Sequence, residues 1–532
     1  MNLINKLLYF IYRRIILLID FKIWQNQFKK LDVKKKKCKK SYLVCSIFTM
    51  PALLKFEMIL STFLSRSNYS GYFLIRSKNK YYERIVSLNQ NCKILNFDDF
   101  VNLNDIEESK AKSRLIIKDF KSNKKKIEKQ VLSTTLRKLR KGQLNLQSNL
   151  DMKVLFDEQV EYFLSRKVSN LLHKKYNFDL LIINEKGYSP ASEFYNDFIK
   201  RGKKVVQWVS SVNDSGFIFK KYNYRNKLLH PFSLDKNTWK KQLKLKWSQK
   251  KHNLILSRIR NFYSKDTWFN RQDLNKNKFF FKKDELIKKL KINKKKKTAV
   301  IFSHIFYDAT FFFGTNIYFD YQEWLVETVK IAVQNKNINW ILKVHPVNIW
   351  RSRMDNAKLE NLEVSAICKE LGDIPENLKI VESDTEINTL SFIEFIDFGV
   401  TVRGTIGLEL SSFGKVVVTA GSGRYDGNGF TLDAKSKKEY KKILMNLHNY
   451  KPLSKSKKER AQKFFEICYE KRPIIFKNFH IDYEARSFGI NDLKYNLKFS
   501  RRNETSFYKC RNTKHLIGWI MNNSQKDILK IE

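Results

Sequence analysis

Apolar segments with strand character alternate with amphipathic segments along the first half of the chain. Short runs rich in β-branched and aromatic residues are bounded by Pro or Gly, and the segments between them have the apolar spacing of helices. The predicted strands are 42–49, 71–76, 178–184 and 204–210, and the predicted helices are 52–63 and 191–200. Alternation of this kind predicts a parallel sheet with helices on its faces.

The same alternation returns after residue 297. The predicted strands are 298–303, 339–344, 378–381, 399–402 and 416–419, and the predicted helices are 321–333, 359–371, 391–395 and a helix from Thr405. We therefore expect an α/β protein with two Rossmann-like, doubly wound domains.

The remaining segments are polar and lysine-rich. Residues 104–174 have a long, charged, helical pattern and are predicted to be a helical insertion, and residues 215–293 are predicted to be connecting helices. The expected organisation is a basic amphipathic segment 1–40, an α/β domain 41–293 that contains the helical insertion, a second α/β domain 294–450 and a basic helical extension 451–532.

Composition favours a folded, basic protein. Among 532 residues, 42% are hydrophobic and 14% aromatic, which excludes a mainly disordered chain, and the formal charge is +50. Residues 301–450 contain 16 Lys and Arg against 19 Asp and Glu, a net charge of −3. The excess positive charge of the chain therefore lies outside this segment. The excess has two open explanations, a biased composition and attraction to an anionic membrane surface. Nucleic acid ranks third, because no nucleic-acid-binding motif accompanies the charge.

The N-terminal segment and the cysteines bear on location. Arg13 and Arg14 divide the apolar runs 7–12 and 15–19, so neither approaches the roughly 20 residues of a membrane span, and no cleavage pattern follows. A helix here is expected either to lie in an anionic membrane interface or to be a buried first helix. Six scattered cysteines form no C-x-x-C pair. We expect a cytoplasmic protein, peripheral on the inner face of the membrane if the first alternative holds.

Eight of the 17 glycines, at positions 399, 404, 407, 414, 421, 423, 427 and 429, fall within 31 residues. Within this cluster, Arg403 and Gly404 follow a predicted strand, and Thr405 is expected to be the N-cap of the next helix. Free N–H groups at a helix start, a guanidinium and a hydroxyl together form a phosphate site. The alternative is a capped helix after a glycine turn. A second loop, with Gly421, Gly423, Arg424 and Tyr425, leaves the next strand and weakens that alternative.

Further polar residues follow neighbouring strands of the same sheet. His345 and Lys343 stand at the end of one strand, Asp308 comes after another, and Glu409 lies in the first turns of the predicted phosphate helix. Imidazole, guanidinium and helix N–H groups suit stabilisation of a departing phosphate, which is electrostatic catalysis. No P-loop, nucleophile elbow, HExxH or DxD-type signature occurs here, so we expect neither a metal nor a cofactor.

These residues resemble a family. The order Lys343-Val-His345-Pro346, Ser383-Asp384-Thr385, Arg403-Gly404-Thr405-Ile-Gly407-Leu-Glu409 and Gly421-Ser-Gly423-Arg424-Tyr425 is similar to that of capsule polysaccharide biosynthesis proteins. These are GT-B-type glycosyltransferases related to bacterial Kdo transferases. The likeness covers about residues 298–450, with a weak echo at 187–193 and 230–239.

The resemblance implies a glycosyltransferase of capsule or surface polysaccharide biosynthesis that takes a nucleotide-sugar donor and a polysaccharide or glycolipid acceptor. It implies that the two domains face a cleft, with the acceptor on the side of domain 41–293 and the nucleotide sugar bound by domain 294–450. It implies that His345, Arg403, Gly404 and Thr405 contact the donor phosphate. We expect Lys343 to join this phosphate site, and the nucleotide or sugar to be bound by Glu409, Gly421, Gly423, Arg424 and Tyr425. The general base stays open, with Asp308 and Glu185 as candidates beside His345 in the catalytic set. Other functions also stay open: a polyol-phosphate transferase, a sugar-nucleotide epimerase, or a non-enzymatic export or nucleic-acid-binding module.

Overall fold

The computed structural model describes residues 3–531 except 30, 32–37, 48–49, 77–79, 123–126, 212–215, 265–276, 350–351, 353–357, 477, 484–494, 500–509 and 522–524. The lysine runs 34–37 and 124–126 lie outside the described residues. The chain forms two compact units. Unit 1 comprises Met1–Ile127, Leu155–Lys227 and Pro473–Glu532, and unit 2 comprises Glu128–Val154 and Leu228–Arg472.

Unit 1 is built on a seven-stranded sheet with the order β13-β6-β5-β4-β1-β2-β3. Its strands are β1 (Lys40–Cys45), β2 (Tyr69–Ile75), β3 (Cys92–Asn96), β4 (Leu180–Ile183), β5 (Lys204–Ser210), β6 (Gly216–Tyr222) and β13 (Ile474–Ile475). β1 to β5 are parallel, whereas β6 pairs antiparallel with β5 and with β13. The parallel part winds outward in both directions from β1 and β4, as in a doubly wound fold.

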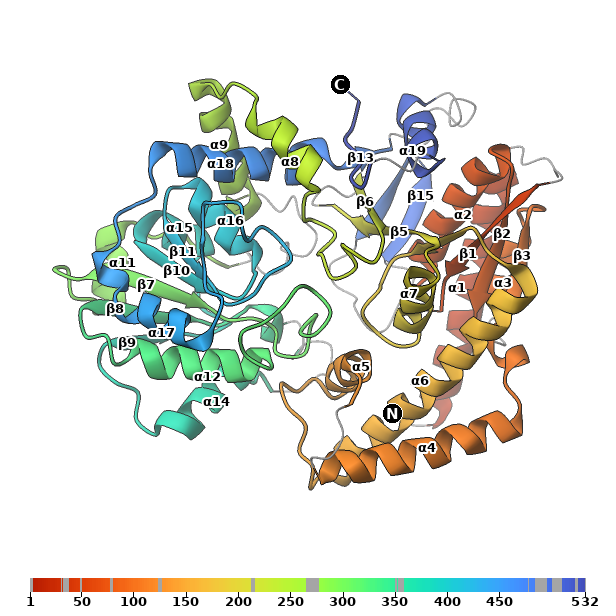
Figure 1. Cartoon of the computed structure of the whole chain (residues 1–532), viewed down its shortest axis with the longest axis horizontal. Helices are drawn as coiled ribbons and strands as arrows, with labels where there is room; N and C mark the ends of the chain where they lie inside the picture. The colour runs from red at the N-terminus through yellow and green to blue at the C-terminus, as the bar shows by residue number, and fades with distance from the viewer. Residues whose placement is uncertain are drawn as a thin grey trace. The chain divides into compact units, whose positions relative to one another are not determined.

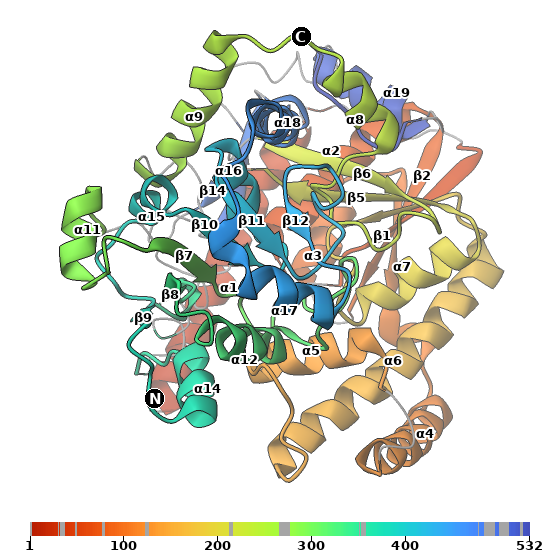
Figure 2. The ribbon, with the colours of Figure 1, turned by 60° about the vertical axis from the view of Figure 1, so that its left-hand side comes forward.

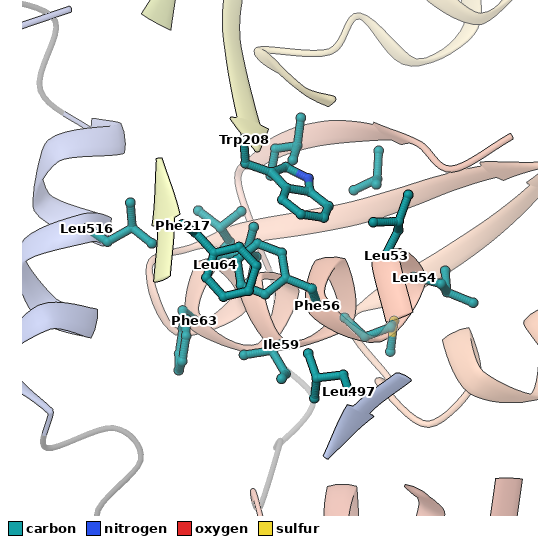
Figure 3. Close-up of a cluster of buried hydrophobic side chains, with 14 of the residues drawn as sticks. Leu53, Leu54, Phe56, Ile59, Phe63, Leu64, Trp208, Phe217, Leu497 and Leu516 are labelled. Carbon is teal, nitrogen blue, oxygen red and sulfur yellow. The ribbon is translucent and has the colours of Figure 1, made fainter. Parts of the chain in front are cut away.

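Helices cover both faces of this sheet because successive side chains of each strand point to opposite sides. Tyr42 and Val44 of β1 join a core with α2 (Pro51–Arg66) and α19 (Arg511–Met521), whereas Leu43 and Cys45 join one with α6 (Asn149–Tyr176) and α7 (Ala191–Lys200). The aromatic centre of the first core, around Phe56, is drawn in Figure 3. The other elements of unit 1 are α1 (Leu3–Lys29), α3 (Lys80–Val86), α4 (Leu103–Lys121), β14 (Phe479–Tyr483) and β15 (Tyr495–Phe499).

Unit 2 contains a six-stranded parallel sheet with the order β12-β11-β10-β7-β8-β9. Its strands are β7 (Lys297–Phe302), β8 (Ile338–Lys343), β9 (Leu378–Val381), β10 (Phe398–Thr401), β11 (Val416–Thr419) and β12 (Leu432–Asp433). Read from β7, the chain moves outward to β9 on one side and then crosses to β10, β11 and β12 on the other. This is the strand order of a dinucleotide-binding fold.

The helices of unit 2 form two layers, which both ribbon views separate (Figures 1 and 2). One layer holds α12 (Tyr321–Ala332), α14 (Leu362–Leu371) and α17 (Lys437–Met445). The other holds α9 (Gln249–Ser264), α15 (Thr389–Phe395), α16 (Thr405–Ser412) and α18 (Lys455–Glu466). The remaining helices are α5 (Lys129–Leu139), α8 (Lys236–Leu243) and α11 (Lys283–Lys289).

The α/β fold class with two parallel sheets is confirmed, and the predicted elements correspond to strands and helices of the structure. Two expectations were wrong: residues 215–293 also contain β6, and the helical extension 451–532 also contains β13, β14 and β15. The domain ranges also differ from the compact units. Residues 473–532 return to unit 1, because β13 pairs with β6, and residues 128–154 of the expected insertion join unit 2.

Among the described residues, no helix combines the length and the apolar character needed to cross a membrane. None of the six cysteines, all of which lie in the described part of the chain, forms a disulfide bond.

Phe56 should be the most sensitive point of the unit 1 core. Its ring stacks on Phe217 with centroids 3.8 Å apart and lies 4.5 Å from the centroid of Trp208. We expect Phe56→Ala to lower the free energy of unfolding by about 3–5 kcal/mol, because it removes a buried ring and leaves a cavity. Urea titration followed by circular dichroism measures this. Leu115→Ala, at a side chain 64% exposed, is the control and should change stability by less than about 0.5 kcal/mol; equal effects would contradict the assigned core.

Candidate functional site

The candidate site lies at the carboxyl ends of β7 and β10, where the strand order of unit 2 reverses. Ligands of open parallel sheets bind at this point, because the loops diverge there and leave a crevice. His304 follows β7 and Arg403 follows β10, so these two side chains stand on either side of the reversal.

His304 ties the two strand ends together. Its Nε2 accepts a hydrogen bond from the backbone N–H of Val402 (3.1 Å) and lies 3.0 Å from Thr401 Oγ1. Because a backbone N–H can only donate, Nε2 carries no proton, and the Thr401 hydroxyl donates to it. Thr401 Oγ1 in turn accepts from the N–H of Gly404 (3.2 Å). The turn that begins α16 is therefore held to the end of β7 by the imidazole.

Positive groups surround this imidazole. Burial lowers the pKa of His304 well below its usual value, and the charges of Arg403, His345 and Arg424 lower that pKa further. The ring stacks on Tyr321 with centroids 4.6 Å apart, which closes it off from solvent on that side. The structure thus brings three predicted site residues, Arg403, His345 and Arg424, to one neutral histidine.

The start of α16 differs by one residue from the expectation. Gly404 is the N-cap, with φ −60° and ψ 152°, and Thr405 is the first helical residue. The expected N-cap role of Thr405 was wrong because the Thr401 side chain already takes the Gly404 N–H and ends the strand earlier. In the described part of the chain, the N–H groups of Thr405 and Ile406 have no hydrogen-bond partner. These two groups give the helix start its capacity to bind an anion.

Tyr425 holds the Gly404 turn in place through its hydroxyl group. Its hydroxyl donates to the Gly404 carbonyl (2.7 Å), and a Cβ at Gly407 would lie 2.0 Å from that hydroxyl. Gly407 is therefore required by the close approach of Tyr425. Tyr425 is 2% exposed, so it positions the turn, and its predicted contact with a nucleotide or sugar stays untested.

Arg403 is buried, at 4% exposure, and only part of its guanidinium is satisfied. Nη2 donates to the Thr315 carbonyl (3.2 Å) and to Asn316 Oδ1. Nε and Nη1 are buried and have no hydrogen-bond partner among the residues described. A buried charged group without partners is costly, and an anion that accepts from Nε or Nη1 would remove that cost.

The second glycine loop packs against the segment that follows β7. Ser422 N–H donates to the Thr315 carbonyl (2.9 Å), and Asn316 forms an antiparallel bridge with Gly421. Gly314 and Gly423 both have positive φ, and a Cβ on Gly314 would lie 2.0 Å from the Ser422 carbonyl oxygen. Close backbone packing therefore accounts for these glycines. Gly423 also accepts a hydrogen bond from the His230 N–H (2.8 Å) through its carbonyl.

His345 is held in one tautomer by its own turn. The Val347 N–H donates to Nδ1 (3.1 Å), so the proton of the neutral ring is on Nε2, and the His345 N–H donates to Ser303 Oγ (2.9 Å). The other His-Pro sequence repeats this turn, with the Phe232 N–H donating to His230 Nδ1 (3.0 Å). The structure places His230 in unit 2, beside the glycine loop, and not in the first half of the fold as the sequence echo indicated.

Lys343, two residues before His345, and the half-buried Lys278 lie near enough for their charges to interact. Lys343 is 5% exposed, and burial, reinforced by the charge of Lys278, lowers its pKa to about 7. Lys278 donates to the carbonyls of Ser383 (3.2 Å) and Thr385 (2.7 Å), and burial lowers its pKa to about 8. These lysines can accept a proton when an anion binds beside them.

The remaining predicted residues have other partners. Asp308 forms an ion pair with Arg137 of α5 (3.1 Å), and its side chain is 43% exposed. Glu409 is buried and accepts a hydrogen bond from the Tyr263 hydroxyl, which joins α16 to α9. Glu185 follows β4 in unit 1, where Oε1 accepts from the Lys186 N–H (2.9 Å). Glu185 therefore belongs to a different unit from His304, His345 and Arg403.

Sequence reasoning missed His304 and Lys278. His304 stands directly after a predicted strand, as His345 does, so the same strand-end argument could have found it. Lys278 carried no such signal, because it lies in a lysine-rich stretch without recognisable strand ends. Within the described ranges, no group of three or more His, Cys, Asp or Glu side chains could hold a metal ion.

No protein-family model and no curated protein matches this chain. Its similar solved structures include the β-Kdo 2,4 transferase of Thermosulfurimonas dismutans KpsC, at 12% identity and TM-score 0.32 over 60% of this chain and 86% of that chain. The β-Kdo 2,7 transferase of the same protein has 15% identity and TM-score 0.31 over 63% and 86%. The UDP-GlcNAc 2-epimerase of Neisseria meningitidis bound to UDP-GlcNAc has 11% identity and TM-score 0.27 over 81% and 97%.

The assignment of each unit to the doubly wound class comes from its own strand order.

Lys343 should make stability depend on pH. Its pKa of about 7 in the folded state lies below the value of 10.5 in the unfolded chain, so the unfolded state binds more protons between these values. Lys343→Met should therefore be more stable than wild type at about pH 6, by on the order of a few kcal/mol, and this difference should shrink as the pH rises to about 10.

Urea unfolding of both proteins across this range measures the difference. The control is Lys442→Met at an exposed position of α17, which should show no such trend. A constant difference between Lys343→Met and wild type would contradict a neutralised Lys343.

Proposed function

We propose that this protein is a nucleotide-sugar-dependent glycosyltransferase that builds a capsule or other surface polysaccharide. The observation that carries the proposal is the buried Arg403 guanidinium, whose Nε and Nη1 lack partners among the described residues, beside the two unpaired N–H groups that begin α16. A nucleotide phosphate would accept hydrogen bonds from these groups. The resemblance to capsule polysaccharide biosynthesis proteins selects a sugar donor from among the ligands that carry a phosphate.

The mechanism we propose is electrostatic. When the bond between the sugar and the phosphate breaks, negative charge accumulates on the departing phosphate oxygen. Donors already in place around this oxygen stabilise the transition state more than the ground state. His345 Nε2–H and the N–H groups of Thr405 and Ile406 would supply hydrogen bonds, and Arg403 and Lys343 would supply positive charge.

His304 would act as a positioning residue. It carries no charge and does not compete for the phosphate, and its hydrogen bonds fix the Thr401–Gly404 turn from which Arg403 extends. Gly421, Gly423, Arg424 and Glu409 remain proposed contacts or supports of the nucleotide or sugar. The acceptor hydroxyl needs a general base, for which we keep Asp308 and Glu185 as the proposed candidates.

The proposal includes independence from a divalent cation. In many enzymes that transfer groups from phosphates, Mg²⁺ neutralises the developing charge. We propose that Arg403, and Lys343 once it takes up a proton beside the bound phosphate, fill this role, so chelation with EDTA should leave the transfer rate unchanged.

Arg403→Met and His345→Gln test the site directly. Each removes a donor to the leaving phosphate, so each should lower kcat/KM for sugar transfer by about 100- to 1000-fold. Arg403→Met should also be at least as stable as wild type, because it removes a buried charge with unpaired N–H groups. Rates are measured with CMP, UDP, GDP and CDP sugars, and products are analysed by mass spectrometry.

The matched control is His448→Gln, at the opposite edge of the same sheet, where the His448 carbonyl accepts from Lys297 at the start of β7. This variant should keep full activity. Full activity in Arg403→Met and His345→Gln would remove the site assignment. If the protein instead released an epimerised nucleotide sugar or transferred a polyol phosphate, the phosphate-site assignment would stand. The reaction would then be epimerisation or polyol-phosphate transfer and not glycosyl transfer.

A further inference from the structure

The N-terminal helix α1 exposes an unusual number of large apolar side chains. Nine of them are between 46% and 61% exposed: Leu7, Leu8, Phe10, Ile11, Tyr12, Ile15, Leu18, Ile19 and Ile23. Elsewhere in the described chain, exposed large apolar residues are spread over several elements. A contiguous apolar surface of this kind marks a contact with a partner or a membrane.

The helix has two apolar faces. One packs on unit 1: Trp24 and Phe28 are buried in the core, and the Trp24 ring lies 5.1 Å from that of Phe499. The other face follows the helical repeat through Leu8, Ile11, Ile15, Leu18, Ile19 and Ile23 and remains exposed. The packed face anchors α1 to unit 1, so the exposed face has a fixed orientation on the unit.

The charges around this face are positive. Asp20, the sole acidic residue of α1, is committed to Lys55 (2.8 Å) and also accepts a hydrogen bond from the Tyr81 hydroxyl. Arg14, Lys22 and Lys29 are exposed. Residues 1–40 contain 12 Lys and Arg against 2 Asp, a net charge of +10.

We propose that the exposed face of α1 docks on a membrane of anionic lipids. A helix with exposed apolar side chains and flanking cations lies in the plane of the interface, with its apolar side chains among the acyl chains and its cations among the headgroups. A second copy of the chain fits this face less well, because two such faces would bring Arg14 and Lys22 of both copies together without a free carboxylate on either helix.

This inference is independent of the proposed transferase activity, because it depends on unit 1 alone. If both hold, a sugar acceptor attached to lipid would meet the enzyme at the membrane surface.

Sedimentation of the full chain with lipid vesicles tests the proposal. Wild type should bind vesicles of phosphatidylcholine and phosphatidylglycerol, and binding should weaken with added salt and on vesicles of phosphatidylcholine alone. The triple variant Ile11→Ser, Ile15→Ser, Ile19→Ser should bind the anionic vesicles at least about tenfold more weakly, because its apolar contribution is lost.

The matched control replaces three exposed leucines elsewhere, Leu103→Ser, Leu115→Ser and Leu254→Ser, and should bind as wild type does. Thermal unfolding of each variant confirms that it folds. Absence of wild-type binding to anionic vesicles, or equal loss in the two triple variants, would overturn the proposal. A wild-type dimer that the α1 variant converts to a monomer would also overturn it and assign the face to a second copy.

Discussion

The geometry of the candidate site depends on the burial of the Arg403 guanidinium, which forms no ion pair among the described residues. Such burial is unfavourable, and the surrounding structure limits the cost by neutralising the other bases nearby. His304 is kept neutral by burial and by the adjacent cations, and the pKa of Lys343 is lowered to about 7. An anionic ligand would offset this cost, so the charge that is unfavourable to bury would strengthen binding of the ligand.

Unit 1 is also doubly wound, but its buried titratable groups include carboxyls, whereas His304, Arg403 and Lys343 of the unit 2 site are basic. Burial raises the pKa of Glu57 to about 8 and that of Glu193 to about 7, so both carboxyls tend toward their neutral forms. Glu57 accepts a hydrogen bond from Trp208 Nε1 (3.3 Å), and Glu193 accepts hydrogen bonds from Ser189 and Ser192. Similar strand orders therefore carry different chemistry, because the side chains that follow the strands and line the helices differ.

Much of the fold could be predicted from the sequence, because the alternation of strands and helices is a local pattern. Helix 191–200 and strands 204–210, 378–381 and 416–419 match the structure residue for residue. β6 could not be found in this way, because Lys220 and Lys221 read as polar. In the folded chain Lys220 is fully buried and pairs with Asp527 (2.8 Å), a partner more than 300 residues away that no local pattern indicates.

In the candidate site, too, residues with a local sequence signal could be predicted, and features that depend on tertiary contacts could not. Arg403 and His345 could be placed because each follows a strand, and the carboxyl ends of parallel strands share one edge. The N-cap was misplaced by one residue because the Thr401 side chain takes the Gly404 N–H. Lys278 was missed because its segment meets the residues that follow β9, Ser383 and Thr385, only after folding.

The return of residues 473–532 to unit 1 has a consequence for biosynthesis. During translation β6 emerges more than 250 residues before β13, so its outer edge has no neighbouring strand while the larger segment of unit 2, Leu228–Arg472, is synthesised. Unpaired strand edges invite aggregation. Unit 2 can therefore mature on the ribosome first, whereas the nascent unit 1 must wait for the last 60 residues, or be shielded by a chaperone, before its sheet is complete.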